Sequence, residues 1–378
     1  MIRPSVIRAF GALRRQPPCL APIRPSLDAA ADWLARAQDA TPDDGVAAYY
    51  DAKADRWAGS YPETTGYIIP TLYAYAESSG RGEFAERATR MAHWESDLQM
   101  ASGAVRAGTL DEPEIVPTIF NTGQVLFGWA SAFQQTGQAR FADSLRRAAD
   151  WLVAAQDADG AWRRFGSPHS HSGLNTYNTR TAYGLIVAAR TLGEPRYAEA
   201  ACANIDWALT CVNSVGWFAH NDLDDNRRTL THTIAYTLRG ILEVGFDQNR
   251  GDYIEQVRRS AQAVIHSLRT DGAIAGRLDR RWRSAVLYSC LTGNVQMAGI
   301  WLALAARSVP GHWREPARHC IAFTQATQNR QHGNAAVRGA IAGSWPRRGS
   351  YMKHRYPNWA AKFYMDALMA LDSAGGNA

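Results

Sequence analysis

The chain of 378 residues is 46% hydrophobic and contains 13 Trp and 15 Tyr, which supplies enough apolar surface for a large core. Its formal charge of +6 comes from dispersed arginines, and the sequence contains neither a recognisable nucleic-acid-binding module nor an apolar run that would span a membrane. The five cysteines are far apart and form no CxxC pair, which argues against a zinc site and against a disulfide framework.

The N-terminal segment, residues 1–25, is interpreted as a basic leader with several arginines. It lacks the continuous apolar region of a secretory signal, so we expect a cytoplasmic protein. Apolar residues stand between the arginines, and the segment is therefore also suited to contact with a membrane surface. We predict a first helix from Ser26 onward and a single domain over residues 26–378.

One unit recurs six times along the chain, and a glycine marks each copy. The turn glycines are Gly45, Gly103, Gly160, Gly216, Gly272 and Gly339, spaced 56 to 67 residues apart. Glycine suits a tight reversal after a helix because it accepts positive φ without a Cβ clash. In the copy over residues 149–190, a helix, the glycine turn, a polar loop and a second helix follow one another. Repetition at a regular period indicates an architecture of helical hairpins.

The two helices of each unit differ in their patterns. First helices, such as residues 84–98 and 253–268, carry one apolar stripe among Arg and Glu, which is typical of a helix with one wet face. Second helices, such as residues 125–133 and 295–305, are apolar nearly all round and are expected to be buried on every side. Two concentric rings of helices satisfy both patterns. The sequence therefore predicts an all-α fold, a closed (α/α)6 barrel of six hairpins, in which closure replaces the capping repeats of an open solenoid.

Thr and Asn residues recur where the second helices begin. They stand at or near Thr65, Asn121, Asn178, Thr231, Thr292 and Asn358. Such side chains accept hydrogen bonds from the free N–H groups of a first helical turn, so we expect them to act as N-caps. In a barrel these starts all lie at one end, together with the long polar loops. We expect the functional site at that end.

Residues with acid-base chemistry stand at three of these starts. Glu63 is placed near a helix N-terminus, where the helix dipole favours a carboxylate, so capping and catalysis are equal alternatives. Tyr67 lies one turn further on, either facing a cavity or packed in the core. His232 is the one histidine directly at a second-helix start, and Tyr177 stands at another start. We select Glu63, Tyr67, Tyr177 and His232 as candidate catalytic residues.

The other loops supply a candidate substrate-binding set. Aromatic and cationic residues alternate in the longest loop, residues 343–359; aromatic faces stack on sugar rings and Arg forks bind carboxylates, so this loop suits an anionic glycan. The candidate substrate-binding residues are Asn121, Trp162, Asn178, Arg180, Arg228, Tyr288, Trp345, Tyr351, Lys353, Arg355, Asn358 and Trp359. His169 and His171 lack the further nearby ligands that a metal needs, so we predict no metal site and no cofactor.

On these features the chain resembles the six-hairpin toroids, a superfamily that includes glycoside hydrolases, polysaccharide lyases, uronyl C5-epimerases and terpenoid cyclases. The repeat behind the resemblance covers residues 26–371. Residues 59–67, 230–240 and 356–366 are similar to conserved blocks of uncharacterised proteins encoded with bacterial exopolysaccharide clusters. Residues 61–65 (Tyr-Pro-Glu-Thr-Thr) are also similar to a tyrosine-rich block of the glucuronyl C5-epimerases. The resemblance implies a carbohydrate-active enzyme whose partner is an anionic polysaccharide or oligosaccharide.

A short acidic segment carries a different resemblance. Residues 222–225 (Asp-Leu-Asp-Asp) match the DxDD motif of class II terpenoid cyclases, and residues 156–162 look like their QW repeat. In those enzymes the motif opens an inner helix, whereas here the helix is expected to begin later, at Thr231. The surrounding loops are rich in Arg and Asn, unlike an apolar cyclase cavity. Terpenoid cyclisation is therefore the last alternative.

Removal or inversion of the proton at a uronate C5, by a lyase or an epimerase, is the leading hypothesis. It needs a base, an acid and a group that neutralises the carboxylate. His232 or Tyr177 would be the base, and Tyr67 or Tyr288 the acid. The neutralising groups would be Asn121, Asn178 and Arg180.

Two further hypotheses keep a saccharide as the ligand. The first is glycoside hydrolysis, with Glu63 as the acid and Asp222, Asp224 or Asp225 as the base. The second is a glycan-binding or assembly protein of an export pathway that has no catalytic activity.

Overall fold

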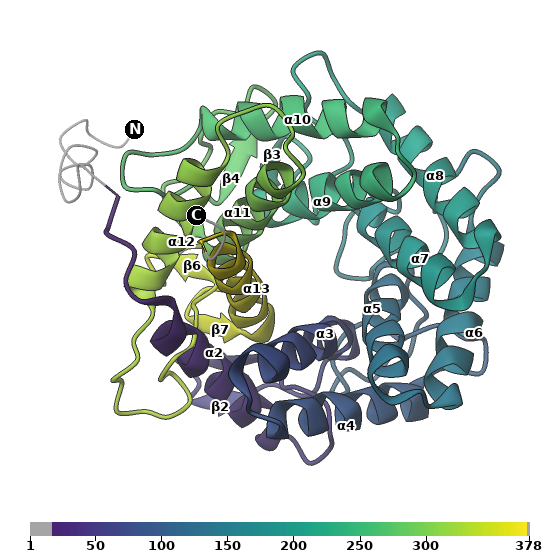
Figure 1. Ribbon diagram of the computed structural model, residues 1–378, viewed down its shortest axis with the longest axis horizontal. Coiled ribbons are helices and arrows are strands. Elements are labelled where there is room, and N and C mark those ends of the chain that lie inside the picture. The colour runs from purple at the N-terminus through teal and green to yellow at the C-terminus, as the bar shows by residue number, and fades with distance from the viewer. Residues whose placement is uncertain (1–16, 376–378) are drawn as a thin grey trace.

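The computed structural model describes residues 17–375, in which twelve α-helices form two concentric rings (Figure 1). The inner ring consists of α3 (Pro62–Ser79), α5 (Ile119–Thr136), α7 (Thr179–Leu192), α9 (Thr231–Asp247), α11 (Leu291–Ala306) and α13 (Asn358–Gly375). The outer ring consists of α2 (Ile23–Asp39), α4 (Glu83–Leu98), α6 (Ala139–Ala155), α8 (Pro195–Thr210), α10 (Gly251–Ile265) and α12 (Arg314–Thr327). The ring closes where α13 contacts α2 and α3. The predicted (α/α)6 barrel is confirmed.

The predicted turn glycines lie in the loops that lead from the outer to the inner helices. Five of them, all except Gly45, have positive φ between 84° and 94°. At Gly160 a Cβ atom would lie 2.1 Å from the carbonyl oxygen of Ala203 on α8. Glycine is required at this position both by the backbone conformation and by the close approach of the next outer helix.

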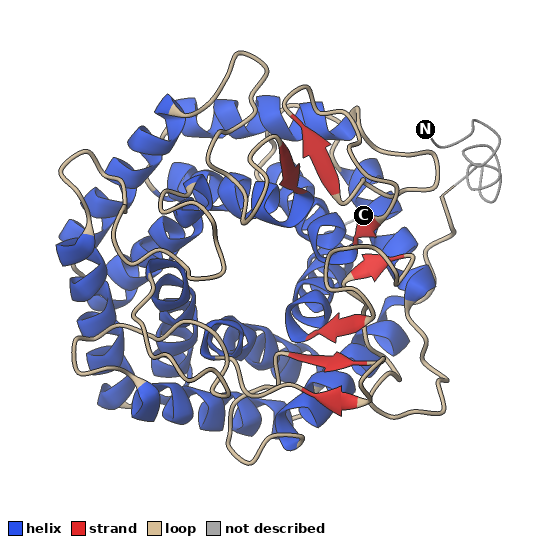
Figure 2. Cartoon of the chain, turned by 180° about the vertical axis from the view of Figure 1, so that it is seen from behind, coloured by secondary structure: helices blue, strands red, loops and turns tan. Residues whose placement is uncertain are grey.

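Short antiparallel strands join the long loops at one end of the barrel, the end that faces the viewer in Figure 2. β1 (Tyr49–Asp51) pairs with β2 (Arg56–Trp57) and with β7 (Arg355–Pro357), so the first and last repeats share one sheet. β3 (Arg228–Leu230) pairs with β4 (Arg277–Asp279), and β5 (Ser289–Cys290) pairs with β6 (Ser344–Trp345). These pairings fix the loops above the starts of the inner helices.

The polar residues at the inner-helix starts bind the loops, and the prediction that they act as N-caps was wrong. No side-chain cap is present at the starts of α3, α5, α7 or α9. Instead, the Thr65 hydroxyl accepts a hydrogen bond of 3.0 Å from the Val46 N–H, and the Thr122 hydroxyl accepts one of 2.9 Å from the Val105 N–H. Both N–H groups follow a turn glycine closely. Because α3 and α5 begin before these threonines, the hydroxyls lie inside the first turn and face the loop.

The inner helices are buried, but α3 and α13 each carry polar residues on one face. On α3, Glu63, Tyr67 and Thr71 follow one another at intervals of four residues and therefore share one helix face. Lys362 and Asp366 are placed in the same way on α13. These faces line the interior of the barrel. Because few polar residues form these faces and most of their neighbours in the sequence are apolar, the pattern could not be recognised from the sequence.

The end of the predicted leader, residues 1–25, is part of the folded structure. Helix α2 begins at Ile23, and the Ala21 N–H donates a hydrogen bond of 2.8 Å to Gln325 Oε1 of α12. Residues 1–16 lie outside the described part, so the membrane contact, the two-part division of the chain and the cytoplasmic location stay predictions. Among the helices of residues 17–375, none combines the length and the apolar character that a membrane span requires. All five cysteines are free thiols, of which Cys290 and Cys320 are buried.

Candidate active site

Glu63 is the central acidic group of the candidate site. It is the second residue of α3, at the end of the barrel that carries the long loops, and it is partly exposed. The Tyr61 hydroxyl donates a hydrogen bond of 2.6 Å to Glu63 Oε2. Burial raises the pKa of Glu63 to about 7, while the hydrogen bond from Tyr61 acts in the opposite direction. At neutral pH the carboxyl group is therefore present in both protonation states, as an acid-base catalyst requires.

Aromatic side chains from the inner helices, together with Tyr177 from the short 3-10 turn before α7, form a connected layer beside Glu63. The aromatic layer consists of Tyr67, Phe120, Tyr177, His232, Tyr236 and Phe363, whose contacting rings have centroids 4.4 to 6.5 Å apart. Burial raises the pKa of Tyr67 and Tyr236, and the charge of Glu63 raises both further. The charge of Glu63 therefore disfavours ionisation of the Tyr67 and Tyr236 hydroxyls. Three of the four predicted catalytic residues belong to the layer, and the fourth is Glu63 itself.

The sixth loop extends this layer outward through two predicted substrate-binding residues. The Tyr351 ring lies 5.7 Å from the His232 ring, and the Trp359 indole N–H donates a hydrogen bond of 2.9 Å to the Tyr351 hydroxyl. Trp359 also contacts Tyr61 edge to face, with ring centroids 6.4 Å apart. Tyr61, Tyr351 and Trp359 are all partly exposed. They give the site an accessible aromatic border of the kind that binds sugar rings.

The two predicted bases are poorly suited to removing a proton from carbon. Burial lowers the pKa of His232 to about 4, so the imidazole is neutral at pH 7 but only weakly basic. Burial raises the pKa of Tyr177, and the charges of Glu63 and Asp222 raise it further, against the hydrogen bond from Ser170. The Tyr177 phenol is therefore held in its protonated form. The electrostatics favour Glu63 as the group that transfers protons.

The three residues predicted to neutralise a substrate carboxylate, Asn121, Asn178 and Arg180, lie in different surroundings. Asn178 is 5% exposed, and its side chain makes no hydrogen bond to any other residue in the range 17–375. It is available to a ligand. Asn121 donates a hydrogen bond of 3.0 Å to the Arg106 carbonyl, which holds the second loop. The Arg180 side chain lines a cavity inside the barrel.

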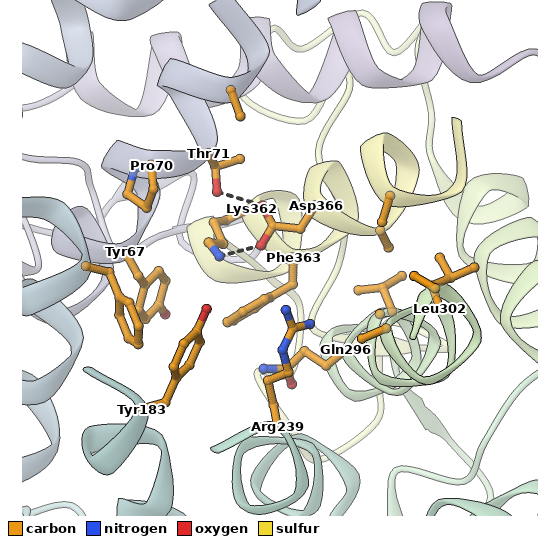
Figure 3. A pocket seen from close by; sticks show the side chains of 18 of the residues that line it. Tyr67, Pro70, Thr71, Tyr183, Arg239, Gln296, Leu302, Lys362, Phe363 and Asp366 are labelled. Carbon is orange, nitrogen blue, oxygen red and sulfur yellow. Dashed lines mark hydrogen bonds and ion pairs between the residues drawn. The ribbon is translucent and has the colours of Figure 1, made fainter. Parts of the chain in front are cut away.

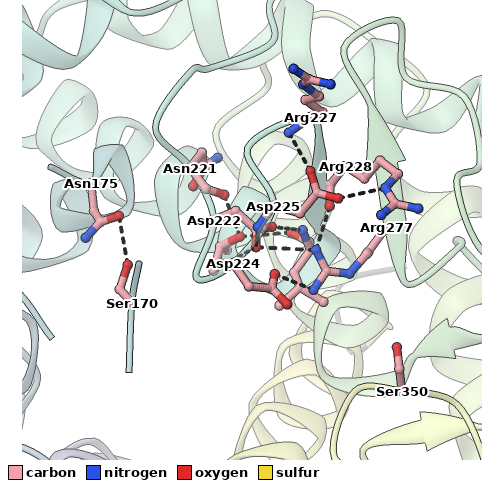
Figure 4. Close-up of polar contacts among 12 residues, drawn as sticks. Ser170, Asn175, Asn221, Asp222, Asp224, Asp225, Arg227, Arg228, Arg277 and Ser350 are labelled. Atoms are coloured by element: carbon pink, nitrogen blue, oxygen red, sulfur yellow. Dashed lines mark hydrogen bonds and ion pairs between the residues drawn. The ribbon is translucent and has the colours of Figure 1, made fainter. Parts of the chain in front are cut away.

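The acidic segment of the fourth loop has a structural role (Figure 4). Asp222 is 1% exposed and accepts hydrogen bonds from the N–H groups of Asp224 and Leu230, at 3.0 and 2.5 Å. Arg277 Nη1 lies 3.4 Å from Asp222 Oδ1, and Arg277 Nη2 lies 2.6 Å from Asp224 Oδ1. Asp225 pairs with Arg228 over 2.7 Å. The carboxylates that resemble a DxDD motif are thus engaged in folding the loop around β3 and β4.

Several predicted substrate-binding residues lie at the edge of the loop end. Arg228 and Lys353 are exposed, and Trp345 is 38% exposed. The Arg355 guanidinium pairs with Asp51 over 3.0 Å. The structure places these four side chains outside the aromatic layer.

The remaining predicted binding residues are buried by the protein itself. Trp162 is 1% exposed and donates its indole N–H to the Leu152 carbonyl over 3.0 Å, so it belongs to the core and offers no surface to a ligand. Asn358 donates hydrogen bonds to the Ala47 carbonyl and to the Thr64 hydroxyl. Tyr288 is 8% exposed and its hydroxyl accepts a hydrogen bond of 2.9 Å from Ser350.

Sequence reasoning missed several residues of the barrel interior. Tyr236 of the aromatic layer was not selected, nor was Tyr61, which binds the central carboxyl group. Lys362 and Asp366 on the interior face of α13 were missed as well. Tyr236 stands four residues after His232, and Lys362 stands four residues after Asn358. Extending each helix-start residue by one helical turn would have identified both.

This ring of six hairpins, with polar and aromatic residues at the starts of its inner helices, is the architecture of the six-hairpin toroids. Residues 82–206, less than half of the chain, match the family described as pectic acid lyase. None of the curated protein sequences matches the chain.

Solved structures of unsaturated glucuronyl hydrolases have the same fold. An enzyme described as specific for heparin superposes with a TM-score of 0.75 and 17% identity, over 94% of this chain and 98% of its own. The enzyme from Bacillus sp. GL1, described as responsible for the degradation of glycosaminoglycan, gives a TM-score of 0.75 and 16% identity, over 93% and 97% of the two chains. The enzyme from Streptococcus agalactiae gives 0.70 and 11%, over 93% and 92%. At these identities the likeness establishes the fold.

Proposed function

We propose that this protein is an enzyme that cleaves uronate-containing oligosaccharides by hydrolysis, with Glu63 as the proton donor. The observation that carries the proposal is the state of Glu63: a partly exposed carboxyl group with a pKa of about 7, hydrogen-bonded to Tyr61 beside a layer of aromatic rings. Glycoside hydrolysis needs an acid that is still protonated near neutral pH. Glu63 meets that requirement.

The chemistry of unsaturated glucuronyl groups suits a site with one such acid. In these sugars a carbon–carbon double bond is joined to the ring oxygen, so the group is an enol ether that takes up a proton on carbon. Water then adds to the resulting cation, and the carboxylate left on Glu63 accepts the proton that this water releases. The product is a hemiketal, whose ring opens to a ketone. Opening leaves a hemiacetal at C1, which breaks down to an aldehyde and releases the neighbouring sugar as an alcohol. The similar solved structures are named for hydrolysis of such groups. Their fold and the raised pKa of the partly exposed Glu63 together support this substrate class here.

Substrate recognition in this proposal depends on the border of the site. The sugar ring stacks on Tyr351 or Trp359, whose rings are partly exposed. The amide of Asn178, which has no hydrogen-bond partner among the described residues, binds the polar groups of the uronate. Trp345 and Lys353 on the same loop are exposed and positioned for the remainder of an oligosaccharide.

A lyase or C5-epimerase acting on a uronate polymer is the second candidate. The match of residues 82–206 to the pectic acid lyase family favours it. Against it stand the electrostatics of its two bases, since the pKa of Tyr177 is raised and that of His232 is lowered to about 4. Hydrolysis by a pair of carboxylates is also disfavoured, because Asp222 and Asp224 are held by Arg277.

One set of assays separates these reactions. Purified protein is incubated with unsaturated uronyl disaccharides and, separately, with intact uronate polymers, while the ultraviolet absorbance of the unsaturated uronate is followed. Hydrolysis of the unsaturated group lowers this absorbance, a lyase raises it, and an epimerase leaves it constant while solvent deuterium enters C5. We expect the absorbance of the disaccharides to fall.

The variant Glu63→Gln tests the residue assignment, with Glu95→Gln as a matched control. Glu95 is another buried carboxyl group, on α4, whose two oxygens have no hydrogen-bond partner among the described residues. We expect turnover to be lost in Glu63→Gln and kept in Glu95→Gln. Full activity of Glu63→Gln, or an absence of turnover with every uronate tested, would overturn the proposal. Saturable binding of a uronate without turnover would instead support the glycan-binding alternative.

A further inference from the structure

A large cavity, called the central cavity below, lies inside the ring of inner helices. It has a volume of about 880 Å³, within the range of small-molecule sites. All six inner helices line it, from Tyr67 and Phe363 of the aromatic layer at its inner end to Ser308 and Ser373 at the ends of α11 and α13. The central cavity therefore lies on the side of the barrel away from the long loops. Figure 3 shows Tyr183, Arg239, Lys362 and Asp366 pointing into this space.

Most charged groups of the central cavity are neutralised within the protein. Lys362 forms an ion pair with Asp366, whose other oxygen accepts a hydrogen bond of 2.7 Å from the Thr71 hydroxyl. The Arg239 guanidinium pairs with Glu243 over 2.6 Å. Each of these cations has a carboxylate of its own. A ligand is not needed to balance them.

Among the buried cations of the cavity, Arg180 is the exception. Its side chain is 7% exposed and lines the cavity, and no carboxylate among the described residues lies within ion-pair distance of it. Its Nε donates a hydrogen bond of 3.2 Å to Gln124 Oε1. Its two terminal nitrogens have no hydrogen-bond partner in the described chain, which leaves up to four N–H donors of a buried cation free.

Aromatic rings hold this guanidinium in place. The centres of the Phe127, Tyr183, Tyr236 and Phe363 rings lie 4.9 to 5.7 Å from the Arg180 Cζ atom. Contacts with ring faces stabilise the cation but do not satisfy its N–H groups. The side chain is therefore fixed and oriented, while its two terminal nitrogens make no hydrogen bond within residues 17–375.

A buried cation without a counter-charge is costly, and an anion bound in the cavity removes that cost. The planar fork of an arginine matches a carboxylate, which it binds through two parallel hydrogen bonds. Among residues 17–375, only one positive charge in the buried part of the cavity lacks a carboxylate partner, so a ligand with a single negative charge is the best match. Apolar and aromatic walls, including Ala130, Val295 and Phe127, favour a ring-shaped body behind the carboxylate.

We propose that the central cavity is a second binding site, separate from Glu63, for a small monocarboxylate with a six-membered ring, whose carboxylate pairs with Arg180. The ring of such a ligand packs between the aromatic side chains at the inner end and the alanine-rich walls of α5, α9 and α11. Two chemical sources share this description: an aromatic acid and a uronic acid. The probes below distinguish them.

The test is calorimetric titration of the full-length protein with benzoate and with glucuronate. Benzyl alcohol and glucose serve as probes of similar shape without the carboxylate, and inorganic phosphate serves as a general anion. We expect saturable binding of at least one carboxylate, and at least tenfold weaker binding of its uncharged counterpart and of phosphate. The carboxylate that binds more tightly identifies the source.

Two variants locate the ligand. Arg180→Gln removes the positive charge, and Ala303→Phe fills the cavity while leaving Arg180 in place. We expect each to weaken binding at least tenfold, with a melting temperature measured for both to show that they fold. Arg314→Gln, which removes an exposed cation that also lines the cavity, is the control and should change binding less than threefold.

The result is independent of the proposed hydrolysis because Glu63→Gln should abolish turnover and leave this binding intact. The inference is overturned if neither carboxylate binds saturably, if the uncharged probes or phosphate bind as tightly, or if folded Arg180→Gln or Ala303→Phe protein keeps the wild-type affinity. Loss of binding in Glu63→Gln would also overturn it, since the ligand would then occupy the loop end of the barrel.

Discussion

His232 Nδ1 and Gln296 Oε1 lie 2.8 Å apart, and this contact joins α9 to α11 between the candidate active site and the central cavity. Because the amide oxygen is an acceptor, the imidazole proton is assigned to Nδ1. A second proton would create a buried cation beside Arg180, which further lowers the pKa of the imidazole. Burial and the charge of Arg180 keep the histidine neutral, although the hydrogen bond to Gln296 acts in the opposite direction.

Acid should destabilise the protein through this histidine. The pKa of His232 is about 4 in the folded protein, below the ordinary value of 6.5, so the unfolded chain binds the proton more tightly. The contribution to the free energy of unfolding is complete above pH 6.5 and is lost as the pH falls toward 4. The change is at most about 3 kcal/mol. Urea unfolding between pH 4 and pH 7 should show a flatter profile for His232→Asn than for wild type. An equally steep profile for the variant would contradict this assignment.

Replacing Glu63 with Gln should lower the activity and raise the free energy of unfolding at alkaline pH. General acid catalysis contributes roughly 10²- to 10⁴-fold to a rate, so Glu63→Gln should lose activity by about that factor. The raised pKa of about 7 means that ionised Glu63 destabilises the fold: its stabilising contribution is present below pH 4.5 and is lost as the pH rises through 7. At pH 8 the variant should therefore unfold with a free energy about 1–2 kcal/mol higher than wild type. An inactive variant that is also less stable at pH 8 would contradict this explanation.

The Tyr61 hydroxyl should set the pH range of activity. Its hydrogen bond lowers the pKa of Glu63 against the effect of burial, so Tyr61→Phe should raise that pKa. Since the protonated carboxyl is the active form, the loss of activity on the alkaline side should move to higher pH by about one unit. The measurement is kcat/KM against pH with an unsaturated uronyl disaccharide. A profile with an unchanged alkaline limb would show that another group titrates.

The two aspartates held by Arg277 should differ sharply on mutation. Asp222 is buried and accepts several backbone hydrogen bonds, so Asp222→Asn should lower the free energy of unfolding by about 2–4 kcal/mol. Asp224 has a side chain that is 53% exposed, so Asp224→Asn should cost less than about 1 kcal/mol and keep activity within a few-fold. Denaturant unfolding and the disaccharide assay measure both effects. If Asp224→Asn were as inactive as Glu63→Gln, hydrolysis by a pair of carboxylates would be restored.

The fold was predictable because it repeats. Each copy supplies an independent observation of the same hairpin, so Gly103, Gly160 and Gly216 together define a period that no single glycine would. Their positive φ angles follow from the same geometry in each copy. The cap prediction failed for Thr65 because a hydroxyl within a first turn has two sets of N–H donors within reach. Which of them it binds depends on the loop from another part of the chain.

The site was only partly predictable, because it depends on where side chains from different helices meet. Glu63 and His232 could be selected from their positions at helix starts, yet the raised pKa of one and the lowered pKa of the other depend on burial by neighbours. Trp162 was selected, like Trp359, as an aromatic residue of a long loop, but its side chain packs into the core. Arg180 was selected as a residue that binds a carboxylate, and this role stays a prediction. Its placement inside the barrel, away from the loops, could not be inferred from its position in the sequence.

The three-stranded sheet of β1, β2 and β7 also bears on the order in which the protein folds. Contacts between the first and last repeats join residues about 300 or more positions apart in the sequence. One example is the hydrogen bond from Asn358 to the Ala47 carbonyl, 311 residues away. A chain emerging from the ribosome therefore holds an unpaired edge at β1 until the last repeat has been made. Contacts so distant in the chain form slowly, so closure of the ring is expected to be a late step of biosynthesis, and premature termination within the last repeat would leave that edge open to pairing with other molecules.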